Sequence, residues 1–133
     1  FTLNFAEEAK HQLSIVNWSK SVGNQWSLLN VATDDASLQV SFFGNYAGWA
    51  DFQFGLANFA DSEATKQISI FYNYAGKTKF QVGMLNIAET LAGYQIGFIN
   101  IAKYSKGCQV GFFNLTINNY SVFPIIPFVN CSM

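Results

Sequence analysis

Charged residues are scarce in this chain of 133 residues, where Asp, Glu, Lys and Arg together make up only 11%. Soluble globular domains usually carry about 25%. All seven basic residues are lysines scattered along the chain, so nothing indicates a surface that follows the phosphates of nucleic acid. We therefore expect no nucleic-acid partner. Half of the residues are hydrophobic, so the surface is expected to be sticky unless another molecule covers it.

Side chains for catalysis and metal binding are equally few. His11 is the only histidine, so a histidine-dependent triad or a metal site with several histidines has at most one member to draw on. The adjacent carboxylates Asp34 and Asp35 stand among turn residues, where solvated turns are expected rather than paired acid–base groups. We therefore expect no enzyme activity, no catalytic or metal-binding residues and no cofactor.

The two cysteines are too few for a disulfide framework and lack the spacing of metal ligands. A single bridge between Cys108 and Cys131 would join the last full repeat to the C-terminal tail, which suits an oxidising compartment. Two buried free thiols are the alternative. The sequence leaves both readings open.

Long uninterrupted hydrophobic runs are also missing. The longest stretch without charge, from Gly107 to Met133, is broken by amide residues and by Pro124 and Pro127. It therefore does not have the composition of a membrane-spanning helix. At 133 residues the chain fits one domain, and its hydrophobic half is ample material for a core.

What the sequence does contain is a repeat of fourteen residues, marked by glutamine. The regular series, which Gln12 and Gln25 precede, is Gln39, Gln53, Gln67, Gln81, Gln95 and Gln109. Most copies follow the pattern Gln, apolar, Gly or Ser, two bulky apolar residues, Asn, apolar, Ala. All fifteen charged residues lie between these phrases. The phrases are therefore expected to be strands, and the connections between them to be turns that face water.

So short a repeat cannot bury its own side chains, so the copies must stack on one another. If the bulky residues share one face, the chain must bend between the two that are adjacent. This favours a β-solenoid in which equivalent amides stack as hydrogen-bonded ladders. The expected ladders comprise the six glutamines above with Asn58, Asn86, Asn100 and Asn114. The alternative is an antiparallel up-and-down β-meander or barrel, with one straight strand per phrase.

The whole chain, 1–133, is expected to be one repeat domain of about nine to ten units. Its first unit is incomplete, because Phe1 to Ala6 already corresponds to the second half of the pattern. Processing of a leader, or a longer parent array, would each explain this start. Residues 117–133 depart from the pattern and are expected to form an atypical C-terminal cap, because proline cannot continue a ladder.

The pattern Gln-x-Gly-x-x-Asn-x-Ala, as in Gln81, Gly83, Asn86 and Ala88, resembles the curlin repeat of bacterial extracellular amyloid fibres. In that family, Gln and Asn ladders line a β-solenoid. The apolar fourteen-residue version, together with the ending Phe123 to Asn130, looks more like a class of bacterial surface repeat proteins first named from leptospires. That resemblance implies a location at the bacterial cell surface and carries no activity.

These observations favour a structural or adhesive surface protein that self-assembles into a fibre or array through open strand edges. Its expected partners are other copies or another surface protein. The alternative is an outer-membrane β-barrel or a barrel-associated subunit, so membrane association stays open. Trp18, Tyr46 and Tyr74 follow the Asn of their units, where core packing or stacking between repeats is expected rather than sugar binding.

Overall fold

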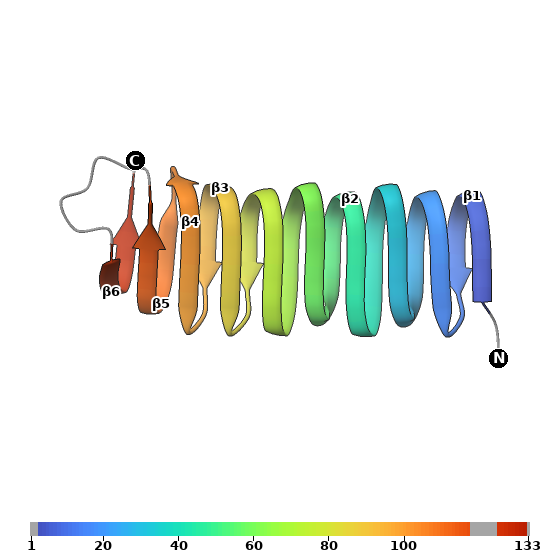
Figure 1. Ribbon diagram of the computed structural model, residues 1–133, viewed down its shortest axis with the longest axis horizontal. Helices are drawn as coiled ribbons and strands as arrows, with labels where there is room; N and C mark the ends of the chain where they lie inside the picture. The colour runs from blue at the N-terminus through green and yellow to red at the C-terminus, as the bar shows by residue number, and fades with distance from the viewer. Residues whose placement is uncertain (1–2, 118–124, 133) are drawn as a thin grey trace.

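The computed structural model describes residues 3–117 and 125–132, and within them the chain is all β. The prediction of a β-solenoid is confirmed: about eight turns stack along one axis, at a spacing of about fourteen residues (Figure 1). The strands are β1 (Leu3–Leu13), β2 (Val16–Val82), β3 (Leu85–Ile96), β4 (Ile99–Ser105), β5 (Cys108–Thr116) and β6 (Ile125–Cys131). β2 is so long because several successive coils continue without a break in their pairing.

Neighbouring coils pair in parallel, with equivalent positions of the repeat side by side. Gln12 pairs with Gln25 between β1 and β2, and Asn86 pairs with Asn100 between β3 and β4. The antiparallel alternative is therefore wrong for the repeats, because it would set unlike positions opposite each other. The one antiparallel pair joins β5 to β6 at the C-terminal end of the described chain.

The interior is made of small apolar side chains and amides. Glutamines and asparagines of the repeat lie fully or almost fully buried, and the core clusters contain Ala almost exclusively, with Val22 and Leu91 as the larger members. Small side chains allow the opposite sides of each coil to approach closely. The amides can be buried because each of them finds hydrogen-bond partners in the coils next to it.

Bulky apolar residues lie on the outside, so a large share of the hydrophobic residues of the chain is on the surface rather than in the core. The adjacent pair Phe42 and Phe43 is 62% and 55% exposed, and the equivalent pairs Leu28–Leu29, Ile70–Phe71 and Phe112–Phe113 are exposed as well. The chain bends at this pair in each coil, so that both side chains point outwards. We call this line of paired residues, which runs along the solenoid, the apolar ridge.

Glycine at the third position of a repeat fits a close approach between coils. A side chain on Gly97 would collide with the backbone carbonyl oxygen of Gly83 and would lie 2.6 Å from Nδ2 of Asn86. Gly111 stands in the same relation to the coil before it. Glycine at these two positions therefore follows from the close approach of the preceding coil.

Candidate functional site

The glutamine ladder runs through the interior of the solenoid with one polarity. Nε2 of Gln67 donates to Oε1 of Gln53 at 2.7 Å, and Nε2 of Gln81 donates to Oε1 of Gln67 at 2.7 Å. The remaining hydrogen of each amide group bonds a backbone carbonyl of its own coil, as Gln67 does with Tyr74 at 2.7 Å. All the glutamines predicted from the sequence, from Gln39 to Gln109, belong to this one ladder.

The asparagine ladder runs beside it with the opposite polarity. Nδ2 of Asn86 donates to Oδ1 of Asn100 at 2.8 Å, and Nδ2 of Asn100 donates to Oδ1 of Asn114 at 2.8 Å. Asn58 belongs to the same ladder, since it accepts a hydrogen bond from Asn45 and donates one to Asn73. Glutamine amides thus donate toward the N-terminal coils, whereas asparagine amides donate toward the C-terminal coils.

The C-terminal end of the glutamine ladder is closed by β6. Nδ2 of Asn130 donates to Oε1 of Gln109 at 3.2 Å, in the place that a further glutamine would take. A disulfide between Cys108 and Cys131 fixes β6 to β5, so the structure has the bridge that the sequence left open. Part of the expected cap, 118–124 with Pro124, lies outside the described residues, as does Met133.

At the N-terminal end, β1 pairs with β2 on one side, and no other described strand lies on its other side. Nε2 of Gln12 donates to the carbonyl oxygen of Trp18 at 3.3 Å, but no preceding amide in the described chain accepts its second hydrogen. This edge of the sheet has the donors and acceptors of a parallel strand with no partner among the described residues.

The outer surface divides into an apolar part and a charged part. The apolar part comprises the ridge and the outward residues of the strands on either side of it, and it extends along the whole solenoid. On one strand, Tyr46, Phe59 and Tyr74 of successive coils stack with ring centroids 5.6 and 4.7 Å apart. The rings of Tyr46 and Tyr74, two of the residues considered for sugar binding, are therefore engaged in stacking between repeats.

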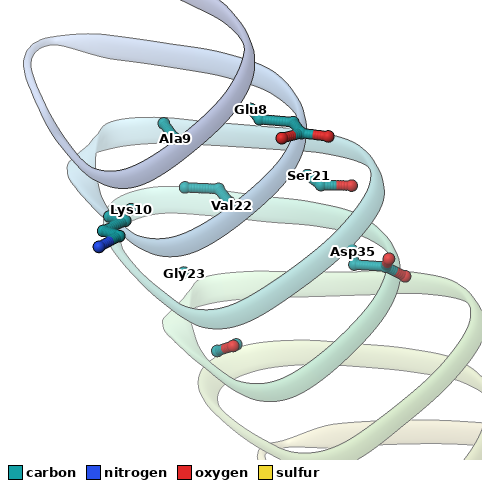
Figure 2. Close-up of a pocket in the computed structure, with 8 residues that line it drawn as sticks. Glu8, Ala9, Lys10, Ser21, Val22, Gly23 and Asp35 are labelled. Carbon is teal, nitrogen blue, oxygen red and sulfur yellow. The ribbon is translucent and has the colours of Figure 1, made fainter.

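The charged residues lie on the segments between the phrases, away from the ridge. Most of these segments are paired strand, as in β1 and β2, so the expectation that they are turns is wrong. Figure 2 shows Glu8, Ser21 and Asp35 at one corner of successive coils, with Lys10 on the opposite side. These residues line an open hollow of about 440 Å³. Gly23 also lines it and contributes only backbone atoms. The ion pair between Lys20 and Glu7 is long, at 3.9 Å, and solvent-exposed, so it stabilises the fold little.

The acid–base and metal-ligating side chains do not converge in the part of the chain that the structure describes. His11 is exposed, and its Nδ1 lies 3.2 Å from Nδ2 of Asn24. No group of three or more His, Cys, Asp or Glu residues is close enough there to hold a metal ion. The hydrogen bond that Tyr46 donates to Asp61, together with burial and the carboxylate charge, raises the pKa of Tyr46 above its ordinary value.

Comparison with known proteins gives no match: no family model, no curated protein and no solved structure matches the chain. The resemblance to curlin and to leptospiral surface repeats therefore stays a prediction. Among the described residues, no helix is of the length and apolar character needed to cross a membrane.

Sequence reasoning missed two features of this arrangement. The first is the direction of the bulky residues, which makes the outer surface the candidate site. The second is the role of Asn130 in ending the glutamine ladder, which no local pattern marks, because β6 runs antiparallel to β5 and lies outside the repeat.

Proposed function

We propose that this protein is a non-enzymatic structural or adhesive repeat protein of a bacterial surface, and that it acts through its outer surface. One observation carries the proposal: exposed apolar side chains cover one part of the solenoid along its length, while amides fill the interior. Contiguous apolar patches of that extent on a soluble protein mark places where another molecule binds.

Two further observations support this proposal. Disulfides persist in oxidising compartments such as the cell exterior, so the Cys108–Cys131 bridge favours a surface or extracellular location. The acid–base side chains are dispersed over the described surface, which favours a binding or structural role over catalysis. The proposal includes no cofactor.

Self-assembly has a second route at the strand edge of β1. This edge would accept another coil in parallel register, whether from the same chain or from another copy, because stacked coils satisfy its amides. The alternative proposal, association with an outer membrane, takes its support from the same exposed apolar residues.

The experiment is purification in buffer without detergent, followed by negative-stain electron microscopy and sedimentation. Fibres, arrays or discrete oligomers are expected. A protein that stays monomeric at all concentrations, and that binds neither other copies nor bacterial envelope preparations, would contradict the proposal. A strict requirement for detergent would favour the membrane alternative.

A further inference from the structure

Apolar hollows lie over one outer strand of the solenoid, beside the ridge, and the repeat pattern joins them into what we call the apolar groove. Its floor is the small residue at the third position of each repeat. One wall is the row of outward residues that follow the glutamines, which we call the glutamine-side row: Leu13, Trp26, Val40, Phe54, Ile68, Val82, Ile96 and Val110. The other wall is the near side of the ridge, with residues such as Leu28, Phe42 and Phe112.

The structure shows this groove as open space at both ends of the solenoid. Near the N-terminus a hollow of about 680 Å³ lies over Ser14, Ser27 and Ser41, between Leu13 and Phe42. Near the C-terminus a hollow of about 440 Å³ lies over the glycines between Ile96 and Phe112, and Phe128 of β6 lines it as well. The residues between the two ends repeat the same pattern of small floor and apolar walls.

We propose that the occupant of this groove is the glutamine-side row of a second copy of this chain, with the two solenoids side by side and parallel. This inference rests on the proposed role in self-assembly and names the surface that carries it. In this arrangement a two-fold axis parallel to the solenoids relates the copies. Each copy's row then lies in the other's groove, so the contact is self-complementary.

The spacing of the repeat supports a second copy as the occupant. Coils stack about 4.8 Å apart, so the projecting side chains of one solenoid have the same spacing as the hollows of another. Interdigitation of identical rows at this spacing is the packing of dry interfaces between paired sheets. A partner of any other sequence would have to match this spacing along the whole groove.

The area is sufficient for a stable dimer. About eight turns at about 4.8 Å give a groove about 38 Å long. The strand that carries the groove presents about five residues across it, or about 17 Å. The contact therefore covers roughly 650 Å² on each copy, close to the roughly 800 Å² per partner of a standard interface.

The charges favour the parallel orientation. Four of the seven lysines come shortly before the glutamines, on the edge of the strand that carries the groove: Lys10, Lys66, Lys79 and Lys106. In an antiparallel pair these lysine edges would lie on the same side of the interface and repel. A two-fold axis parallel to the solenoids places them on opposite sides. Because the net charge of the chain is only −1, electrostatic attraction gives a lipid surface no advantage as occupant.

A matched pair of isoleucines in one coil tests the interface. Ile96 lines the groove, whereas Ile101 lies on the other strand of the same coil and is also turned outward. Sedimentation velocity of the full oxidised chain between about 1 and 100 µM should show a dimer for the wild type. Ile96→Lys should weaken dimerisation at least tenfold, because it places an unpaired charge in a desolvated contact. Ile101→Lys should leave the dimer unchanged.

Cross-linking tests the orientation. A Leu13→Cys variant treated with a short bismaleimide should form a covalent dimer through the introduced cysteine, because parallel copies bring equivalent N-terminal coils together. A dimer that forms but does not cross-link at this position would overturn the parallel arrangement. Circular dichroism of each variant establishes that the fold is retained.

Other outcomes separate this inference from the proposed function. Filaments that persist in Ile96→Lys and are lost in Ile101→Lys would uphold self-assembly but overturn the groove as its surface. A monomeric wild type that floats with phosphatidylcholine vesicles, and loses this binding in Ile96→Lys, would identify lipid as the occupant and overturn the inference. A wild-type dimer without filaments would support the groove and contradict only the fibre.

Discussion

Replacement of one ladder glutamine by an isosteric apolar residue should destabilise the solenoid strongly. Gln67→Met keeps the length of the side chain but removes three hydrogen bonds, each 2.7 Å long: to Gln53, to the carbonyl of Tyr74 and from Gln81. A buried polar group that loses its partner costs about 1–3 kcal/mol. Burial of the apolar methionine offsets about 1.5–3 kcal/mol. Because three partners lose a hydrogen bond, the cost is about 3–9 kcal/mol together, and the expected net loss is about 1.5–6 kcal/mol.

The neighbouring residue provides the control. Ile68→Met introduces the same side chain one position later, on the outer surface, and should cost less than about 1.5 kcal/mol. Both variants are compared with the wild type by urea unfolding followed by circular dichroism, where a lower midpoint at constant slope reports the loss of stability. Gln12→Met, at the end of the ladder with fewer partners, should fall between them. If Gln67→Met loses no more than Ile68→Met, the ladder does not stabilise the fold and the reasoning fails.

Three other changes test the packing, the cap and the surface electrostatics. Gly97→Ala places a methyl group against the preceding coil and should lower the free energy of unfolding by about 1–3 kcal/mol. Urea unfolding measures this loss. Cys131→Ser should speed hydrogen exchange in the last coil and lower stability by about 2–4 kcal/mol, whereas unchanged exchange there would contradict the role of β6 as a cap. In a spectroscopic titration, Tyr46 should ionise above the ordinary value of 10.0, and Asp61→Asn should lower its pKa. The raised pKa favours the protonated folded form, so its stabilising effect is present below that pH range and is lost as pH rises through it.

The repeat period and the parallel stacking could be predicted because they follow from spacing alone. A unit of fourteen residues with all charges in one segment requires neighbours, and equivalent amides at a constant interval require stacking in register. The C-terminal cap could not be predicted in the same way. Its antiparallel strand contacts β5 through Asn130 and Cys131, and neither residue occupies a position of the repeat.

Two coils carry one extra residue before the asparagine, Gly44 in one and Tyr72 in the other, and they show a local conflict. Asn45 and Asn73 keep their places in the ladder, although each follows its predecessor in the ladder by fifteen residues. The side-chain oxygens of Ser41 and Ser69 in these coils are buried without a hydrogen-bond partner. In coils without the insertion, Ser14 and Ser27 bond the Asn of their own unit. The coils with the insertion therefore keep the asparagine ladder but lack the hydrogen bond from serine to asparagine.

The sequence reasoning did not assign the inward face of the repeat, although the variation of side-chain size along each row indicates it. The pattern divides the residues into a bulky set and a small or amide set, and the hydrophobic effect alone would bury the bulky set. Yet the bulky set varies from Val40 to Trp26 at one position, whereas the glutamine position does not vary at all. A close-packed interior between stacked coils tolerates little change in volume, so the constant set must lie inside. The variable set then covers the surface, where a partner meets it.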